Sequence, residues 1–132
     1  MAAVSSLIHN RKRAKQLLAF DGLEWKGKKV TDIDMSMDWN GETFVFGEVK
    51  GMGQSVGFGQ RFHYESLVRG LVDGGRKAVA YIAHHDTPNP SDDVFLHDLY
   101  ISEYFDSKRG WVTPRQAITV YDFMDRLHRR WT

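Results

Sequence analysis

The chain has 132 residues, of which 42% are hydrophobic and 13% aromatic, and its formal net charge at neutral pH is +1. These values are typical of a globular protein with a core of two or three layers, and we expect residues 1–132 to form a single domain. No apolar run is long enough to span a membrane, and the absence of cysteine excludes disulfides, thiolate metal sites and iron–sulfur clusters.

The charges are distributed unevenly along the chain. Basic residues gather in the first thirty positions and at the end, whereas acidic residues gather in residues 32–48 and 86–106. Basic ends around an acidic middle suit a protein that holds phosphates together with a cation, although solvated helix faces explain the same pattern. The apolar residues at the start precede the basic ones, the wrong order for a signal peptide. We therefore expect a cytoplasmic protein without membrane contact.

Residues 5–20 are predicted to form a first helix. It carries His9, a lone histidine that is only a weak candidate for a site residue. Three basic side chains on this helix, Arg11, Arg13 and Lys15, are expected to contact nucleic-acid phosphates. A short strand is expected over residues 23–25, with a turn at residues 26–28.

Residues 29–50 predict a β-hairpin with an Asn-Gly turn. Apolar and polar side chains alternate before the turn, and the second strand ends in Glu48-Val49-Lys50. A two-residue turn of type I′ would place Asp34 on the face opposite Glu48, whereas a three-residue loop or one classic bulge pairs these two carboxylates directly. We predict the three-residue register, because it gathers Asp34, Glu48 and Lys50 on one face. Replacing either Glu48 or Lys50 should leave the protein folded, since charges at strand ends are commonly exposed.

A glycine-rich segment over residues 51–59 is expected to let the backbone pass close to a phosphate or to the next helix. That helix is predicted to run from about residue 58 to residue 73, where two glycines follow. Its inner stripe consists of Tyr64, Leu67, Val68 and Leu71. One turn earlier the stripe reaches Gln60, whose amide needs partners and is expected to find them at the end of the Glu48–Lys50 strand.

The opposite face of this helix carries Arg61, Glu65 and Arg69 at i, i+4 spacing. The simplest interpretation is a solvated ladder of ion pairs. Residues 76–83 then predict a buried strand, parallel to its neighbour if the helix makes the crossover.

The remaining elements are a strand and a helix. A strand is expected over residues 94–104. A last helix is predicted to begin at residues 113–116, Thr-Pro-Arg-Gln, a capping box with proline at the first helical position. Its apolar stripe should dock on the sheet: Ala117, Val120, Tyr121, Met124, Leu127 and Trp131. The pair His84-His85 is a weak metal site, because adjacent strand residues point to opposite faces.

This order of elements predicts an α/β fold. We expect a mixed central sheet of about four or five strands, flanked by helices on both faces. An acid, a hairpin, a Glu-x-Lys strand end and a helix that opens with Gln-x-x-x-Tyr follow one another in this chain. Together they resemble the PD-(D/E)XK nuclease superfamily, and residues 60–64 resemble its RecB-like branch. The resemblance covers about residues 30–84, with Ile33 where some members have the namesake proline.

The resemblance implies a restriction-endonuclease-like core and a metal-dependent nuclease. Such an enzyme hydrolyses phosphodiester bonds in nucleic acid, here with DNA favoured and RNA open, as an endo- or exonuclease. The chain departs from the family at the upstream histidine motif, for which only His9 is present, and it has no cluster cysteines.

The same resemblance implies a role for each site residue. Mg²⁺ or Mn²⁺ would be bound by Asp34, Glu48 and the backbone carbonyl of Val49, all hard oxygen ligands. Lys50 would orient the attacking water and offset charge in the transition state. The helix would add Gln60, to position Lys50, the water or a phosphate, and Tyr64, to support it or to touch the nucleic acid. Two other acids on the Asp34 face are possible second acids, Asp38 and the nearer Asp32.

Two other classes of function remain open. One is a catalytically inert nuclease-like module that binds nucleic acid or protein, and the other is a metal-binding or structural domain unrelated to nucleases. Binding of a divalent metal without cleavage would favour either. We also expect a homodimer, because a core of this size offers little surface to grip a duplex. In addition, Trp111, Trp131 and the aromatic residues of 100–105 exceed what one small core buries.

Overall fold

The structure is a computed structural model, and it describes residues 24–29, 31–89 and 91–131. The chain divides into two units, Met1–Val30 and Thr31–Thr132. In the first unit, β1 (Glu24–Trp25) and β2 (Lys28–Lys29) pair antiparallel. This confirms the predicted short strand and turn, although the turn is tighter than expected because Lys28 already belongs to β2. The predicted first helix, with His9, Arg11, Arg13 and Lys15, lies outside the described residues.

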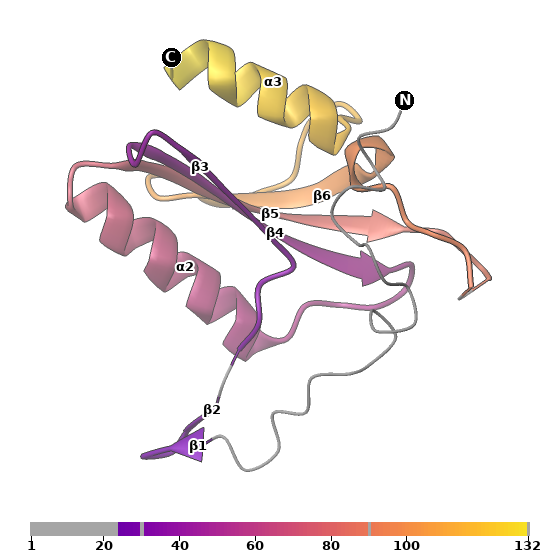
Figure 1. Ribbon diagram of the computed structural model, residues 1–132, viewed down its shortest axis with the longest axis horizontal. Coiled ribbons are helices and arrows are strands. Elements are labelled where there is room, and N and C mark those ends of the chain that lie inside the picture. The colour runs from indigo at the N-terminus through magenta and orange to yellow at the C-terminus, as the bar shows by residue number, and fades with distance from the viewer. Residues whose placement is uncertain (1–23, 30, 90, 132) are drawn as a thin grey trace. The chain divides into compact units, whose positions relative to one another are not determined.

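The second unit is built on one five-stranded mixed sheet (Figure 1). The strands lie in chain order, with β4 and β5 parallel and every other neighbouring pair antiparallel. The strands are β3 (Met35–Trp39), β4 (Thr43–Gly51), β5 (Lys77–His85), β6 (Tyr100–Asp106) and β7 (Gly110–Val112). The helical elements are α2 (Phe58–Asp73), α3 (Val120–Trp131) and the 3₁₀ turn η2 (Leu96–Asp98).

The two helices cover opposite faces of the sheet (Figure 1). On one face, Phe46 and Phe105 of the sheet pack with Tyr64 and Val68 of α2. On the other face, strand residues and Phe123 of α3 form a second cluster. Successive strand residues alternate between these clusters, as the pleat requires. The structure thus confirms the predicted α/β class, with a mixed sheet between helices.

The β4–α2–β5 unit brings the site residues together. The predicted helix over residues 58–73 is confirmed, and β5 is buried and parallel to β4 as predicted. Ligand sites in such sheets lie beyond the carboxyl ends of parallel strands. In this molecule the carboxyl end of β4 carries Glu48 and Lys50, and the amino end of α2 carries Gln60.

The hairpin register is the one with three loop residues. Trp39 pairs with Thr43 and Met35 pairs with Gly47, so one further step places Asp34 opposite Glu48. The two central residues of the turn both have positive φ, as a type I′ turn requires. The backbone N–H of Glu42 closes this turn by donating to the carbonyl of Trp39 at 3.1 Å, but Thr43 rather than Glu42 is the ladder partner of Trp39. The carbonyl of Glu42 accepts a hydrogen bond of 2.9 Å from the backbone N–H of Lys77 at the start of β5.

Two predicted strands begin later than expected. The first strand of the hairpin begins at Met35 rather than near residue 29. The strand predicted over residues 94–104 begins at Tyr100, because η2 replaces its first half. The 3₁₀ turn brings Leu96 and Leu99, three residues apart, against the core on the α3 side, so their spacing reflects this turn rather than a strand.

The predicted start of the last helix is wrong. Helix α3 begins at Val120 rather than at residue 114. Ile101 N donates to the carbonyl of Ile118 at 2.9 Å and Val120 N donates to that of Leu99 at 2.8 Å, so this segment pairs with β6 before the helix starts. The cap is Thr119, whose hydroxyl oxygen accepts from Asp122 N at 3.2 Å. Most of the predicted stripe docks on the sheet, but Ala117 precedes the helix and is exposed, Tyr121 is exposed, and Phe123 takes the buried position.

The outer face of α2 is not a solvated ladder. Arg61 forms an ion pair of 2.6 Å with Glu103 of β6 and stacks over Trp111. Glu65 accepts a 2.9 Å hydrogen bond from the indole N–H of Trp111, and only the Glu65–Arg69 pair has the predicted i, i+4 geometry. These contacts fix α2 to β6 and β7.

Among the described residues, no helix is long and apolar enough to cross a membrane.

Candidate functional site

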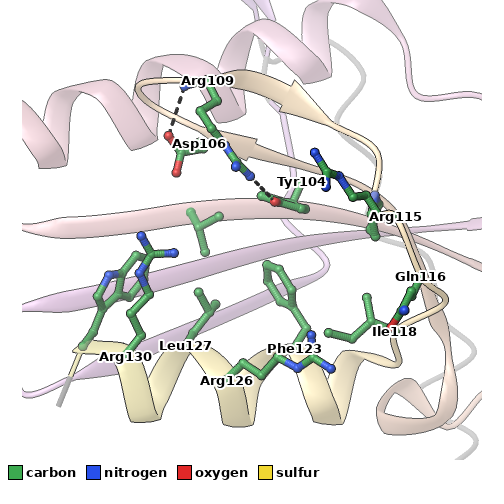
Figure 2. A pocket seen from close by; sticks show the side chains of 13 residues that line it. Tyr104, Asp106, Arg109, Arg115, Gln116, Ile118, Phe123, Arg126, Leu127 and Arg130 are labelled. Atoms are coloured by element: carbon green, nitrogen blue, oxygen red, sulfur yellow. Dashed lines mark hydrogen bonds between the residues drawn. The ribbon is translucent and has the colours of Figure 1, made fainter.

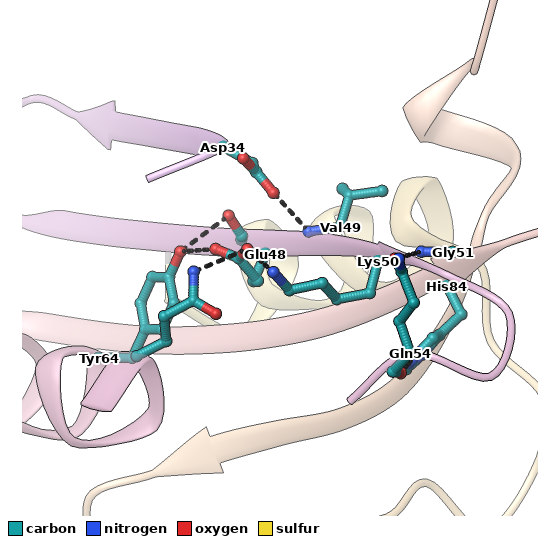
Figure 3. Close-up of polar contacts among 10 residues, drawn as sticks. Asp34, Glu48, Val49, Lys50, Gly51, Gln54, Tyr64 and His84 are labelled. Atoms are coloured by element: carbon teal, nitrogen blue, oxygen red, sulfur yellow. Dashed lines mark hydrogen bonds and ion pairs between the residues drawn. The ribbon is translucent and has the colours of Figure 1, made fainter. Parts of the chain in front are cut away.

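The candidate site lies where β4 ends, at the amino-terminal end of α2 and beside the residues that precede β3 (Figure 3). Glu48, the central residue, is buried, with 2% of its surface exposed. Its Oε1 accepts a 2.6 Å hydrogen bond from the hydroxyl of Tyr64. Its Oε2 accepts from Gln60 Nε2 at 3.2 Å and pairs with Lys50 Nζ at 3.2 Å. Both oxygens of this carboxylate are therefore held in place.

The burial of Glu48 corrects one expectation and accounts for its protonation behaviour. The sequence predicts an exposed charge at the strand end, but α2 packs over this part of β4 and covers it. Burial raises the pKa of Glu48, and the negative charge of Asp34 raises it further. The hydrogen bond from Tyr64 and the ammonium of Lys50 act in the opposite direction without cancelling the rise in pKa.

Asp34 reaches the same strand end from the β3 side. Its Oδ2 accepts a 2.8 Å hydrogen bond from the backbone N–H of Val49. This bond takes the place of a backbone ladder bond at the position where β3 has not yet begun. The side chain is exposed, and its Oδ1 has no hydrogen-bond partner among the described residues. The predicted trio of Asp34, Glu48 and Lys50 is thus gathered at one end of β4.

Neither of the two alternative acids makes a hydrogen bond to Glu48, although the charge of Asp32 acts on Tyr64. Asp38 closes the hairpin turn, since its Oδ1 accepts from Gly41 N at 2.7 Å, at the opposite end of β3 from Asp34. Asp32 is exposed and makes no hydrogen bond within the described part of the chain. The structure therefore favours Asp34 as the acid that accompanies Glu48.

The helix residues orient Glu48 rather than face a ligand directly. Tyr64 has no exposed surface, so it cannot touch a nucleic acid, contrary to one of its two predicted roles. Burial and the hydrogen bond to Glu48 raise the pKa of the Tyr64 hydroxyl well above its ordinary value, which keeps it a donor. Gln60 is partly exposed and directs its amide N–H at Glu48 rather than at Lys50. Tyr64 is therefore a positioning residue.

Hydrogen bonds hold the glycine-rich segment in place beside the site. Gly51 N donates to the side-chain Oε1 of Gln54 at 2.9 Å. The two ring nitrogens of His84 make hydrogen bonds, Nε2 with the backbone carbonyl of Gln54 and Nδ1 with the hydroxyl of Ser102. In the neutral ring, Nε2 donates to the carbonyl, so Nδ1 accepts from Ser102. With both ring nitrogens used in this way, His84 stabilises the loop.

Tyr81 is a buried residue that the sequence pattern did not single out. It has no exposed surface, and its hydroxyl has no hydrogen-bond partner among the described residues. Its ring crosses Gly47, where a Cβ would lie 2.4 Å from Tyr81 Cζ. Because Gly47 pairs with Met35, the hydroxyl lies near the entry to β3, and the charge of Asp34 adds to burial in raising its pKa. The only signal in the sequence was a polar tip within an otherwise apolar strand.

The donor set suits a hard divalent cation. Glu48 pairs with the ammonium of Lys50, whereas Asp34 accepts only the backbone N–H of Val49, so the Asp34 carboxylate has no ion-pair partner among the described residues. Carboxylate and carbonyl oxygens are the ligands that Mg²⁺ and Mn²⁺ prefer. Within the described residues, no group of three or more His, Cys, Asp or Glu side chains gathers as a metal site. The predicted set has two such side chains plus the Val49 carbonyl.

Comparisons with known proteins give no match: no protein-family model, no curated protein and no solved structure is significantly similar to this chain.

Proposed function

We propose that this chain is a metal-dependent nuclease that hydrolyses phosphodiester bonds in nucleic acid, with DNA as the favoured substrate. The observation that carries the proposal is the buried carboxylate of Glu48, held by Tyr64, Gln60 and Lys50 with Asp34 beside it. A buried acid with a raised pKa and one charge partner is typical of functional sites. A cytoplasmic location, expected from the sequence, belongs to the same proposal.

The proposed roles follow from the contacts. Asp34, Glu48 and the Val49 carbonyl would hold Mg²⁺ or Mn²⁺, which when bound supplies a water of lowered pKa and polarises the phosphate. Tyr64 and Gln60 hold the Glu48 carboxylate in one orientation. Lys50, one-quarter exposed, has its ammonium 3.2 Å from Glu48, where it can orient the attacking water and offset charge on the phosphate. The leaving oxygen takes its proton from solvent.

The experiment distinguishes a residue that binds the metal from a residue that supplies only charge to the reaction. Linear and plasmid DNA are incubated with the protein in Mg²⁺, Mn²⁺ or EDTA, and Mn²⁺ binding is measured in parallel by calorimetry. Glu48→Gln should lose both metal binding and cleavage. Lys50→Ala should keep the metal, because an ammonium is no ligand, but lower turnover by about 10² or more. Gln60→Ala should fall between, since it only orients Glu48.

Matched controls remove the same charges elsewhere. Glu42→Gln and Lys108→Ala change exposed residues and should leave both readouts unchanged. Equal cleavage by wild type and Lys50→Ala would assign the activity to another site or a contaminant. Mn²⁺ binding by the wild type without cleavage of DNA or RNA would favour the alternative, an inert nuclease-like binding module.

A further inference from the structure

A second cluster of charges lies on the other side of the sheet, between α3 and the β6–β7 hairpin. There the structure has a cavity of about 420 Å³ (Figure 2). Its floor is apolar and includes Val79, Ile118, Phe123 and Leu127, which belong to the α3-side core. Because Glu48 and Tyr64 lie on the α2 side, this cavity is separate from the candidate nuclease site.

Four arginines from three separate segments surround the cavity. Arg109 comes from the β6–β7 turn, Arg115 from the loop before α3, and Arg126 and Arg130 from α3 itself. Arg109 is oriented by a hydrogen bond to the hydroxyl of Tyr104, as Figure 2 shows. The other three have no ion-pair partner within the described residues. The cavity is therefore strongly cationic.

The four arginines are exposed, and their like charges repel one another weakly in the protein alone. Arg126 and Arg130 are four residues apart on one helix, the spacing at which like charges destabilise a helix. Cations near the end of a helix complement its dipole, which accounts for Arg130 but not for Arg109 or Arg115 on other segments. The one acid in the lining, Asp106, is engaged by its own turn, since its Oδ1 accepts from Lys108 N and Arg109 N. A bound anion would relieve the repulsion.

The lining indicates which kind of anion fits. Guanidinium groups bind phosphates in a bidentate manner and stack on flat rings. Trp131 is a half-buried aromatic side chain of the lining, and ring stacking is how proteins hold nucleobases. The ring of Tyr104 already packs with Phe123 and lies under the Arg109 guanidinium. Gln116 and Asp106 add an amide and a carboxylate that can meet the polar edge of a base, groups for which a densely acidic peptide offers no counterpart. The volume is within the range of small-molecule sites.

We propose that this cavity binds a nucleoside monophosphate unit, with the phosphate on the arginines and the base against the aromatic lining. The unit is either a free nucleotide or one nucleotide of a single strand, since both present the same chemistry. The proposal is independent of the nuclease activity.

The test measures binding in EDTA, where no metal-dependent cleavage occurs. The probes are AMP, inorganic phosphate and adenosine by calorimetry, and a fluorescent oligo(dA) by anisotropy. Wild type should bind AMP more tightly than phosphate or adenosine. The triple variant Arg115→Ala/Arg126→Ala/Arg130→Ala should bind AMP about tenfold more weakly or worse. The matched control Arg69→Ala/Arg76→Ala/Arg129→Ala removes the same charge outside the cavity and should bind AMP as wild type does.

Two further variants test whether the base is recognised and whether AMP binds in this cavity rather than at the candidate nuclease site. Gln116→Ala, an exposed loop substitution, should weaken AMP but not phosphate. Lys50→Ala should bind AMP normally. If the natural ligand is one nucleotide of a single strand, oligo(dA) should bind far more tightly than AMP. The triple variant should then reduce the slope of log affinity for oligo(dA) against log salt by about two. If the source is a free nucleotide, AMP binds at least as tightly as oligo(dA).

Several outcomes would overturn the proposal. These are no AMP or oligo(dA) binding by wild type, equal AMP binding by the triple variant and its control, phosphate binding as tightly as AMP, and displacement of AMP by a synthetic acidic peptide at lower concentration. AMP binding that disappears in Lys50→Ala and persists in the triple variant would place the nucleotide at the candidate nuclease site instead. Circular dichroism of each variant checks that the fold is kept.

Discussion

At the scale of single residues, Glu48 and Tyr81 are both buried polar side chains, but only Glu48 has partners for its polar atoms. Glu48 has three hydrogen-bond or ion-pair partners, whereas the Tyr81 hydroxyl has none among the described residues. An unpaired buried hydroxyl costs free energy that a paired one does not. This difference can be measured without any assumption about activity.

The two buried tyrosines provide the comparison. Tyr81→Phe should leave the free energy of unfolding unchanged or raise it by up to about 1 kcal/mol, because it removes only an unpaired hydroxyl. Tyr64→Phe should lower it by about 1.5–3 kcal/mol, since it removes a donor to a buried carboxylate. Urea denaturation in EDTA measures both. A loss in Tyr81→Phe as large as in Tyr64→Phe would mean that the Tyr81 hydroxyl has a partner.

Glu48 should also make stability depend on pH. Because its pKa is raised in the folded state, the folded protein binds the proton more tightly than the unfolded chain. Its contribution to stability is therefore greatest below the ordinary glutamate pKa and is lost as the pH rises through the raised value. In EDTA, Glu48→Gln should be more stable than wild type at neutral pH, with a gap that shrinks as the pH falls toward the ordinary glutamate pKa. A gap that grows on acidification would contradict the direction of this shift.

At the scale of elements, the packing of β5 against β4 depends on a glycine in β4, Gly47. Gly47 has no Cβ, and the buried Tyr81 ring fills that space. Gly70, in the interior of α2, has nothing within 4 Å of its would-be Cβ. The same substitution should therefore have opposite effects at the two positions.

Gly47→Ala should lower the free energy of unfolding by about 1–3 kcal/mol or more, because a buried ring cannot move aside. Gly70→Ala should raise it by up to about 1 kcal/mol, as expected for alanine over glycine in a helix. Thermal and urea denaturation measure both. A stable Gly47→Ala variant would show that Tyr81 can leave its place.

At the scale of the whole molecule, the predicted contact of the N-terminal basic residues with phosphates remains a prediction. Replacing Arg11, Arg13 and Lys15 together by alanine should weaken binding to every DNA sequence alike. It should also reduce the slope of log affinity against log salt by up to about three on duplex DNA, because each of the three cations would neutralise one phosphate. Anisotropy titrations at several salt concentrations measure this. An unchanged slope would make these residues part of a solvated surface.

The homodimer also remains a prediction, although one reason for it is weaker. Trp111 and Trp131 pack against the two cores and Phe105 is buried, so Tyr100 is the main exposed aromatic of that set. Light scattering over a range of concentrations should show twice the monomer mass. A monomer at every concentration would exclude the dimer.

The sequence by itself determined the class of fold and most elements, and it indicated the residues of the candidate site. Alternation, the helical stripe of α2 and the buried run of β5 are local patterns, because each follows from how one element buries its own face. The set of Asp34, Glu48, Lys50, Gln60 and Tyr64 was indicated instead by the order and spacing of its motifs, which resemble those of a nuclease superfamily. The three-residue hairpin register was predicted because it places the charged side chains of Asp34, Glu48 and Lys50 on one face.

The tertiary structure alone decided what depends on contacts between distant elements. The start of α3 depends on pairing of residues 118–120 with β6, which competes with the capping box at residues 113–116. The burial of Glu48 depends on α2 lying over β4, and the role of Gly47 on a ring from β5. The arginine cavity joins three segments that no sequence period relates. Such features arise from packing across the sheet, which spacing along one element does not encode.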